Sequence, residues 1–563
     1  MLKFGGSAAG DRVVRQAKVA TSSVRQSGLF KTVTDELLRK RFTSRRSAYR
    51  LEITTTTTTV LLFGRAGHVA GGAGISMNLD PRNRRSVESQ DTDRVAVDRV
   101  KRECGMMPNR TNQALSMQRR GFLKSGLAAG GLTGLGLSLS DLLSVRAAAA
   151  PARTSGQAKA CILLYMTGGP AQQETFDMKP KANQGYRGDF NPIETSVPGV
   201  EVCEHLPMLA RQAHRYSVIR STYHNSNTHG IGVHYNMTGL KNAPRTRGEP
   251  QMDRVDPPCV GGVVRQLRGD HNGLPASVHL PVRIGDQNNF QWGGQHAGFL
   301  GPNFDPLMLI DESWKPGTLP PGFRPPKGVG DRRQESRQRL LTRVEQSRAE
   351  VSPAEANYGR FQQQALDILG SNSAWRAFTF DDESPETLAR YGDNKFGRSC
   401  LVARRLVEAG VGLVTVPWMY LHSTKNFDTH DKHFKVMKDL LLPPMDRAFS
   451  ALIEDLTERG RLNETLIAWT GEFGRTPKVN KKAGRDHWGP VYSTVLAGGG
   501  IRGGQVYGSS DKIAGYPADN PVHVRDFIAT IYHCLGYGSD TRVVDPTGRP
   551  HFVVQGTPVH SLF

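Results

Sequence analysis

The stretch TLIAWTGEFGRTPKVNKKAGRDHW, residues 465–488, carries the pattern that decides the fold of this chain. It begins with a largely apolar run, residues 465–473, which is typical of a strand buried on both faces of a sheet. Glu472 lies at the end of this run, and Asp486 and His487 follow after a segment with two arginines, two glycines and a proline. Charges gathered after a buried strand indicate a metal site, a structural turn or a surface for an acidic partner.

Further apolar runs and helical patterns alternate along the chain. The runs that predict strands lie at residues 160–170, 216–221, 276–281, 411–418 and 492–500. Helices are predicted at residues 336–370, 401–410, 431–460 and 522–536, and Pro443 and Pro444 are expected to split the third of these. This alternation predicts an α/β fold with a mostly parallel sheet flanked by helices on both faces. In such sheets, ligands bind beyond the carboxyl ends of the strands.

The composition is that of a globular protein rich in loops. Hydrophobic residues make up 37% of the 563-residue chain, which also contains 61 glycines and 33 prolines. About half of the formal charge of +21 lies in residues 1–116, which hold 21 Lys and Arg against 10 Asp and Glu, so we expect no nucleic-acid partner. The six cysteines form no CxxC pair, a spacing that leaves room for one disulfide but favours buried free thiols.

Residues 117–151, MQRRGFLKSGLAAGGLTGLGLSLSDLLSVRAAAAP, resemble a twin-arginine export signal. Arg119 and Arg120 precede a Gly/Ala/Leu-rich run that ends in four alanines. The run is short, rich in glycine and interrupted by Asp141, so no stable transmembrane span is expected. We therefore predict export by the twin-arginine machinery to the periplasm or cell envelope.

The position of this signal divides the chain into three parts. Because an export signal is normally N-terminal, residues 1–116 are either a disordered basic extension or the product of a mis-assigned start, with Met107 or Met117 as the true one. Residues 117–157 then form the signal and a linker, and little compact structure is expected before about residue 158. Residues 158–563 form one α/β domain with a Gly/Pro-rich insertion around residues 282–335.

Four groups of acidic and imidazole side chains follow apolar runs. They are Glu174 with Asp177, then Asp428 with His430, Asp431 and His433, then Glu472, and finally Asp486 with His487. Carboxylates and imidazoles together suit a divalent cation such as Zn²⁺, Mn²⁺, Mg²⁺ or Ca²⁺. Taken singly, each group fits a helix cap or a polar turn better than a metal site, and it is their joint occurrence after apolar runs that supports one shared site.

Three further histidines, His224, His229 and His234, recur every five residues. This spacing does not align them on one face of a helix. We therefore expect them to lie in loops and to support the site from behind.

Several motifs resemble one exported bacterial family. GGPAQQETFDMKP (168–180), FDTHDKHF (427–434), TGEFGRTP (470–477), GRDHW (484–488) and LAGGGIRGGQVYGSSD (496–511) are similar to those of the family catalogued as domain of unknown function 1501. The resemblance runs from about residue 158 to the C-terminus. This family is similar to the alkaline phosphatase and sulfatase superfamily, so the resemblance implies an alkaline phosphatase-like domain with a metal site at the strand ends.

The resemblance also implies roles for individual residues. Asp428 and His430 look like metal ligands, and His487 resembles the later lone histidine of the superfamily. Glu472 stands where an aspartate is usual, Glu174 or Asp177 would replace the acid after the first strand, and Asp486 would lie in or beside the ligand set.

The expected nucleophile is missing from the corresponding position. Counting back from Thr238-Gly239 puts His229 where sulfatases have a modified Cys or Ser, and Thr228 is the nearest hydroxyl. The resemblance therefore implies either a metal-activated water or Thr228 as the nucleophile. The arginines that could hold an anionic ester are Arg220, Arg475 and Arg485, although pairing with nearby carboxylates is an equal alternative.

Two functional hypotheses follow from these residues. The first is an exported metal-dependent hydrolase of phosphate or sulfate esters, acting on an anionic ester or polysaccharide. The second is a non-catalytic envelope or polysaccharide-binding protein that retains the hydrolase fold and uses residues 282–335 to bind a partner. The carboxylate and imidazole groups favour the first hypothesis, whereas a histidine at position 229 favours the second.

Overall fold

The computed structural model describes residues 156–241, 253–271, 273–285, 291–311, 313–321, 323, 371–418 and 426–563. It also describes residues 333, 336, 339, 340, 343 and 366–368 and the strands β1 (Glu52–Thr56) and β2 (Thr59–Phe63). The chain divides into two compact units, Met1–Gly121 and Phe122–Phe563.

In the first unit, β1 and β2 pair antiparallel, with Glu52 opposite Phe63. These two short strands lie in residues 1–116, for which the sequence predicted a disordered extension or a mis-assigned start, and threonine and valine favour extended backbone there. The other residues of this basic extension and the twin-arginine segment up to residue 155 lie outside the described residues.

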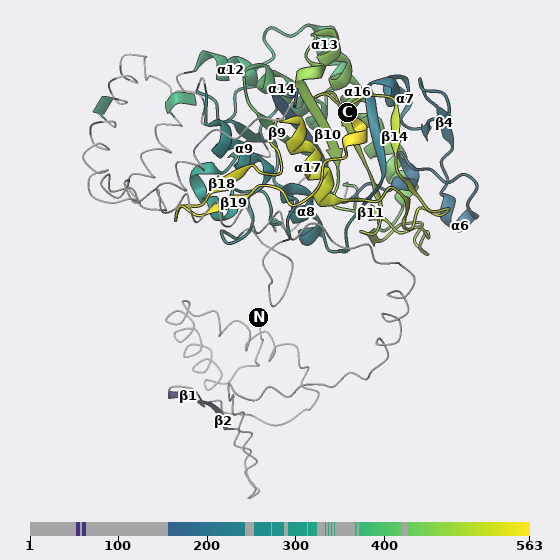
Figure 1. The fold of residues 1–563 in the computed structure, drawn as a ribbon, viewed down its shortest axis with the longest axis horizontal. Helices are drawn as coiled ribbons and strands as arrows, with labels where there is room; N and C mark the ends of the chain where they lie inside the picture. The colour runs from purple at the N-terminus through teal and green to yellow at the C-terminus, as the bar shows by residue number, and fades with distance from the viewer. Residues whose placement is uncertain are drawn as a thin grey trace, which may run out of the picture. The chain divides into compact units, whose positions relative to one another are not determined.

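A nine-stranded sheet forms the centre of the second unit (Figure 1). Its strands run in the order β14-β6-β13-β10-β3-β9-β7-β8, and β17 also pairs with β6. β13 runs antiparallel to β10 and β6, and every other pairing in this sheet is parallel. The predicted mostly parallel sheet is therefore confirmed. The strands are β3 (Ala160–Met166), β6 (Tyr216–Tyr223), β7 (Ser277–His279), β8 (Leu307–Met308), β9 (Leu413–Trp418), β10 (Thr465–Thr470), β13 (Tyr492–Ala497), β14 (Gln505–Tyr507) and β17 (Val522–His523).

The central strands are buried on both faces, as their continuous apolar runs predict. In β3, Ile162 and Leu164 belong to one hydrophobic core, whereas the alternate residues Cys161 and Leu163 belong to the other. This alternation follows from the two-residue period of a strand. The sheet therefore separates two cores, each covered by its own helices.

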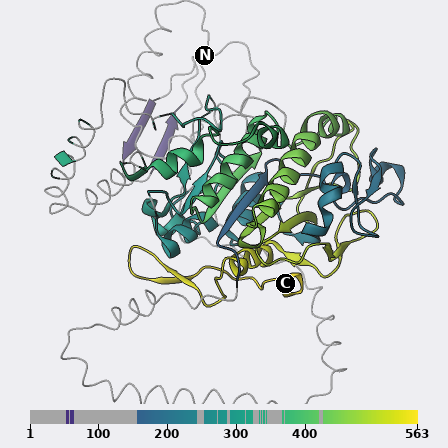
Figure 2. The ribbon, with the colours of Figure 1, turned by 90° about the horizontal axis from the view of Figure 1, so that it is seen from above.

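Helices cover the two faces in separate groups. The first core is closed by α7 (Pro207–Gln212), α12 (Asn372–Phe378), α13 (Pro385–Tyr391), α14 (Lys395–Glu408) and α16 (Leu442–Glu458). The second core is closed by α8 (His229–Thr238), α9 (Val260–Arg268) and α17 (Val524–Cys534). In Figure 2 the green helices lie on one side of the sheet and the yellow C-terminal segment lies on the other.

The region of the predicted helix at 431–460 is indeed split, but the break comes before the prolines. α15 (His433–Val436) passes into a π-helical turn, η7 (Met437–Leu441), and α16 then begins at Leu442. Pro443 and Pro444 occupy the first turn of α16, where a residue without a backbone N–H is tolerated.

Among the remaining elements, four antiparallel strand pairs form two-stranded sheets separate from the central one. All of these remaining elements are short. They are η3 (Gln172–Glu174), α6 (Gln184–Arg187), β4 (Pro192–Glu194), β5 (Glu201–Cys203), η4 (Ala213–Arg215), η5 (Gly298–Leu300), η6 (Pro302–Phe304), η8 (Leu462–Glu464), β11 (Gly474–Arg475), β12 (His487–Trp488), β15 (Ser509–Ser510), β16 (Pro517–Asp519), β18 (Arg542–Val544), β19 (Pro550–Phe552) and η9 (His560–Leu562).

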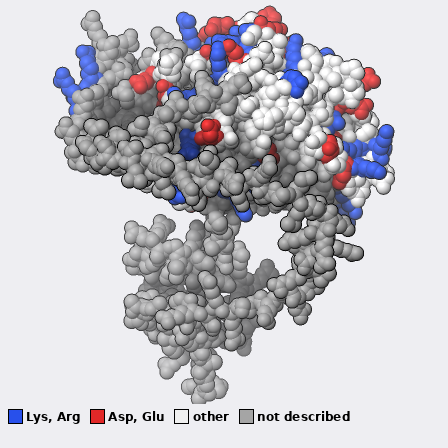
Figure 3. Space-filling model, viewed as in Figure 1, with Lys and Arg blue, Asp and Glu red and all other residues white. Residues whose placement is uncertain are grey.

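The cysteines and the surface agree with a globular domain. All five cysteines of the described residues are buried free thiols, in keeping with the predicted pattern; they are Cys161, Cys203, Cys259, Cys400 and Cys534. On the face shown in Figure 3, Lys and Arg side chains mingle with Asp and Glu across the described surface. Among the described helices, none combines the length and the apolar composition needed to cross a bilayer.

A buried histidine in β7 makes the stability of the domain depend on pH. Burial lowers the pKa of His279 from 6.5 to about 4, although its Nε2 lies 2.8 Å from the carbonyl oxygen of Val282. Between these two pH values the unfolded chain binds a proton and the folded chain does not. The stability that neutral His279 contributes is therefore complete above pH 6.5 and is lost as the pH falls toward 4.

We expect His279→Gln, which keeps an N–H donor for Val282 but cannot titrate, to flatten this dependence. Between pH 7 and pH 5 the native chain should lose about 2 kcal/mol more unfolding free energy than the variant. Urea denaturation at both pH values measures the difference. Equal losses in the two proteins would contradict the assignment.

Candidate metal centre

Several of the acidic and imidazole residues meet beyond the carboxyl ends of β6, β9 and β10. Asp428 and His430 belong to the segment after β9, and Glu472 follows β10 directly. The chain then forms a two-stranded ribbon in which β11 pairs antiparallel with β12, so that Arg475 lies opposite His487. His229 joins them from the first position of α8, which follows β6. Residues 465–488 thus form a strand followed by a ribbon that returns to the same end of the sheet.

The Asp428 carboxylate lies at the centre of this group. Its Oδ1 is 3.0 Å from Nε2 of His430 and 3.0 Å from Nε2 of His487, and its Oδ2 is 3.4 Å from Nε2 of His229. Ligand atoms of His229, Asp428 and His487 all lie within 4.8 Å of one another. We call these three residues and His430 the Asp428 cluster.

Each imidazole of the cluster is held from behind through its other nitrogen. An Nδ1–H can donate to an outer acceptor in all three cases, and this fixes the ring so that Nε2 faces Asp428. The three outer pairs are His229 to Glu472 Oε1 at 2.7 Å, His430 to Asp486 Oδ1 at 2.7 Å, and His487 to the Asn227 carbonyl at 2.9 Å. Such outer acceptors are the usual companions of histidines that bind metal ions.

This arrangement calls for a positive charge inside the cluster. Nε2 of His430 lies 2.9 Å from Nε2 of His487. If both rings carry their proton on Nδ1, two nitrogen lone pairs face each other at that distance and repel. A proton on one nitrogen or a cation between the rings removes the repulsion. The donor set of imidazoles and one carboxylate suits a divalent transition metal such as Zn²⁺.

The pKa values also indicate that the cluster attracts positive charge. Burial opposes ionisation of Asp428, but hydrogen bonds from the three imidazoles and the nearby Arg475 lower its pKa well below the ordinary value. Burial likewise opposes a charge on His229, yet hydrogen bonds with Asp428 and Glu472 raise its pKa to about 9. Burial lowers the pKa of His487. Asp428 is therefore a carboxylate at neutral pH.

Glu472 is fully buried and orients His229. Its Oε1 accepts hydrogen bonds from the Gly168 N–H at 2.7 Å and from His229. Its Oε2 has no hydrogen-bond partner in the structure. Burial and the Glu472 charge together raise the pKa of the Tyr165 hydroxyl well above its ordinary value. Gly168 has a positive φ of 104°, and a Cβ there would collide with the backbone of Asp428, so this approach requires glycine.

The structure corrects the predicted roles of two arginines. Arg475 and Arg485 are fully buried, and neither has a fork free to hold an anionic ester. Arg475 donates to Asp428 Oδ1 at 2.6 Å and to the carbonyls of Gly168, Gly169 and Arg485. Arg485 donates to Glu174 and to the carbonyls of Thr476, Pro477 and Tyr186. Both side chains therefore hold protein segments together.

The predicted first-strand acids also lie elsewhere. Glu174 accepts from Arg485 Nη2 at 2.7 Å, and its Oε2 lies 2.9 Å from His433 Nε2. All three side chains are fully buried, and we call them the Glu174 triad. Burial opposes the charge of Glu174, but Arg485 and His433 lower its pKa. Within this triad, Glu174 neutralises the charge of Arg485. Glu174 was expected to bind metal, but it anchors the ribbon instead.

Asp177 takes no part in the Asp428 cluster either. Its Oδ1 lies 2.8 Å from Lys179 Nζ and 3.8 Å from Arg220 Nε, and its Oδ2 accepts from the Ser510 hydroxyl. Arg220 donates in addition to the carbonyl of Glu201. Asp177 therefore joins the loop after β3 to β15 and β6.

His224, His229 and His234 were expected to lie in loops, but His229 and His234 belong to α8. Thr228 is the N-cap residue of α8, and it is His229 that reaches the cluster. Of the other histidines, His224 lies with its Nε2 2.5 Å from the Glu472 carbonyl, and His234 lies within α8.

Sequence reasoning missed Trp292, whose ring stacks on His229 with the ring centroids 4.6 Å apart. It also missed Asn227, whose carbonyl holds His487. Trp292 lies in the Gly/Pro-rich insertion, which has no periodic pattern, and a backbone acceptor such as Asn227 leaves no signal in residue type.

Residues 158–563 match the family model described as Protein of unknown function (DUF1501), which confirms the resemblance seen in the motifs. A comparison with curated protein sequences finds no match. Three similar solved structures are Ps i-CgsB in complex with k-i-k-neocarrahexaose, the lipoteichoic acid synthase LtaP from Listeria monocytogenes, and a protein in the alkaline phosphatase superfamily from Vibrio parahaemolyticus.

Those three chains are 13%, 10% and 11% identical to this one, with TM-scores of 0.33, 0.30 and 0.29. The alignments cover 71%, 69% and 70% of this chain and 74% of each of the others. At this level, the likeness concerns the fold and carries no argument about chemistry.

The Glu174 triad yields a prediction about stability. Glu174→Gln leaves Arg485 buried without its counter-charge, and we expect it to lower the unfolding free energy by about 3–5 kcal/mol. The exposed Glu194→Gln is the matched control and should change it by less than about 0.5 kcal/mol. Urea denaturation measures both. If Glu174→Gln instead removed bound metal without loss of stability, Glu174 would be the ligand that its sequence position implied.

Proposed function

The chain belongs to the DUF1501 family, and from the geometry of its candidate metal centre we propose that it is an exported, metal-dependent hydrolase of phosphate or sulfate esters. One observation carries the proposal: three imidazoles, each held through Nδ1 by an outer acceptor, direct Nε2 toward one carboxylate. Buried charges of this kind are costly unless they serve a ligand or a partner.

Three residues of the Asp428 cluster would hold the cation, namely His229, Asp428 and His487. Three protein ligands and one open position are the usual composition of a catalytic zinc site. When bound, such a cation polarises an ester oxygen and lowers the pKa of water. Glu472 fixes the His229 ring for this purpose, and the Asn227 carbonyl fixes the His487 ring.

His430 is the remaining imidazole and is the most exposed of the cluster, at 41% of its side chain. Its Nδ1–H is directed at Asp486, and the hydrogen bond with Asp428 is the main cause of its raised pKa. A protonated Nε2 on the open side of the site can pass its proton to the departing alcohol oxygen. We therefore give His430 the role of general acid and Asp486 the role of its positioning partner.

One observation favours the second candidate, a non-catalytic envelope or polysaccharide-binding protein. Among the described residues, no serine, threonine or cysteine side chain is hydrogen-bonded to the Asp428 cluster, and this weighs against a covalent mechanism through a hydroxyl such as that of Thr228, which precedes His229. Hydrolysis would then require water as the nucleophile. Metal content and turnover decide between the two functions.

Variants of Asp428 and His430 distinguish a metal ligand from the proposed proton donor. We expect the purified chain to carry one divalent cation, and Asp428→Asn to lose both the cation and the hydrolysis of p-nitrophenyl phosphate and p-nitrophenyl sulfate. His430→Asn should keep the cation and lower kcat by about 10²–10⁴-fold. Asp431→Asn, which changes an exposed carboxylate near the site, is the control. Elemental analysis, thermal shift with added metal and turnover are the readouts.

One outcome would contradict the metal centre, and another would contradict the hydrolase function. A cation-free native chain whose melting temperature does not respond to added Zn²⁺, Mn²⁺, Mg²⁺ or Ca²⁺ excludes the metal centre. A metal-loaded chain without esterase activity on either compound supports the non-catalytic alternative.

Export is tested separately. The motif around Arg119 and Arg120 supports the proposal of twin-arginine transport, although these residues lie outside the described part. Replacing both by lysine should leave the chain in the cytoplasm, whereas Arg110→Lys, outside the pair, should not alter transport. Cell fractionation checks the result, and periplasmic delivery of the twin-lysine variant would overturn the proposal.

A further inference from the structure

Exposed lysines border the candidate metal centre on its ribbon side. The tip of the ribbon carries Lys478, Lys481 and Lys482, and Lys432 follows the His430 segment; all four are exposed. The backbone N–H of Lys432 donates to the Lys482 carbonyl at 3.1 Å, so the two segments lie side by side. We call these four residues the lysine rim.

The lysine rim is attached directly to the cluster. The Asn480 side-chain amide donates to the His430 carbonyl at 3.0 Å and lies 3.3 Å from Asp486 Oδ1. No described acidic residue forms an ion pair with a rim lysine. Because Arg475 and Arg485 are used inside the protein, the rim supplies the accessible positive charge on this side.

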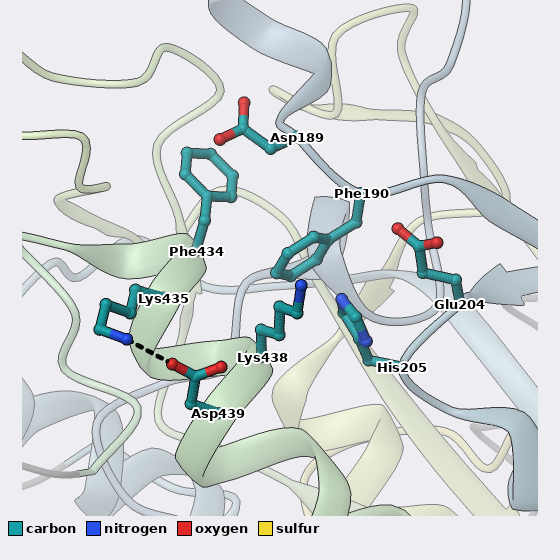
Figure 4. Close-up of a pocket in the computed structure, with 8 residues that line it drawn as sticks. All are labelled: Asp189, Phe190, Glu204, His205, Phe434, Lys435, Lys438 and Asp439. Carbon is teal, nitrogen blue, oxygen red and sulfur yellow. Dashed lines mark hydrogen bonds and ion pairs between the residues drawn. The ribbon is translucent and has the colours of Figure 1, made fainter.

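A pocket of about 440 Å³ is lined in part by Phe434 and Lys435, which follow His430 in the chain (Figure 4). Phe190 and Phe434 form its apolar walls, with ring centroids 5.7 Å apart. Figure 4 shows the Lys438 side chain extending toward the part of the pocket formed by Phe190 and His205. Lys435 is paired with Asp439 at 2.7 Å, which leaves Lys438 as the lysine of this pocket without a described ion pair.

The same pocket offers acceptors as well as a cation. Asp189 and Glu204 are among its lining residues, and burial lowers the pKa of His205, so that its ring is neutral at pH 7. A neutral imidazole and carboxylates bind hydroxyl groups, and aromatic rings pack against the C–H faces of a sugar. A second pocket of about 710 Å³ adjoins the first, since Glu204 and His205 line both.

The pocket lies within reach of the metal centre. Phe434 is four residues from His430, so their Cα atoms are at most about 14 Å apart even if the chain is fully extended. The Glu174 triad connects the two places, since its His433 precedes Phe434 and its Arg485 precedes Asp486. The pocket and the His430 end of the cluster are therefore close enough for one chain-like ligand to span.

From this arrangement we propose that the lysine rim and the Phe190–Phe434 pocket form a binding track for an anionic polysaccharide. Anionic groups of the polysaccharide contact the rim lysines, and a neighbouring sugar ring of the same polysaccharide occupies the pocket. The inference rests on the proposed function, because it identifies the polysaccharide as the carrier of the ester that the site cleaves. Carboxylates in the pocket accept hydrogen bonds from the hydroxyls of a sugar ring but repel phosphate and sulfate groups, so an uncharged ring suits the pocket and the anionic groups suit the rim.

The test measures binding of the full chain to dextran sulfate and to neutral dextran by affinity electrophoresis. The native chain should bind dextran sulfate, and raised salt should weaken this binding. The double variant Lys481→Gln/Lys482→Gln should weaken it by roughly threefold to tenfold. Phe434→Leu should weaken it as well, while turnover of p-nitrophenyl esters stays at the native level in the lysine variant. Lys159→Gln is the control, because Lys159 is exposed at the opposite end of β3.

Several results would overturn the inference. These are equal binding of the two dextrans, an effect of Lys159→Gln as large as that of the rim variants, or tighter binding of oligodeoxythymidylate than of dextran sulfate through the same lysines. Failure of the proposed function looks different. In that case ester turnover is absent from the native chain while lysine-dependent binding of dextran sulfate persists, and the track then belongs to a non-catalytic glycan-binding protein.

Discussion

The buried guanidinium of Arg475 is the interaction on which the rest of the site depends. Taking an arginine out of water costs several kcal/mol unless its donors find acceptors. Here acceptors come from the Gly168-Gly169 turn after β3, from the Asp428 segment after β9 and from the ribbon after β10. Because the guanidinium fork is planar and rigid, these bonds fix three loops relative to one another. The Asp428 cluster can form only where that fixing has been achieved.

The Glu174 triad is a second case in which a buried arginine fixes loops through its hydrogen bonds, and no hydrogen bond joins its three described side chains to the Asp428 carboxylate. Arg485 closes the ribbon by donating to the carbonyls of Thr476 and Pro477, and its charge is balanced by Glu174. Burial lowers the pKa of His433, whose Nε2 contacts Glu174 Oε2 and so ties the start of α15 to the loop after β3. Both arginines therefore hold the ribbon in place by hydrogen bonds to neighbouring loops. This role explains why charged residues follow the buried strand β10 in the sequence.

The sequence predicted the fold and the inner acidic and imidazole residues because both leave patterns in residue type. Continuous apolar runs identified the buried strands, and the groups after them contained Asp428, His430, Glu472, Asp486 and His487. Residue type does not reveal the partner, however. A buried carboxylate has the same pattern whether it binds a cation or balances an arginine, so Glu174 was assigned to the wrong partner. The spacing of His229 predicted a supporting role and the family resemblance put it at the nucleophile position, and the geometry of α8 brings it into the cluster.

Exposure increases in one direction across the site, and this gradient shows from which side a ligand arrives. The exposed fraction of the side chain rises from 0% at Glu472 to 10% at His229, 21% at His487 and 41% at His430. Asp486, the outer partner of His430, is 57% exposed. The orienting carboxylate therefore lies deepest, where water cannot compete for its hydrogen bonds. The open side is the one that bears the lysine rim, so a ligand that enters there meets positive charge before it meets the Asp428 cluster.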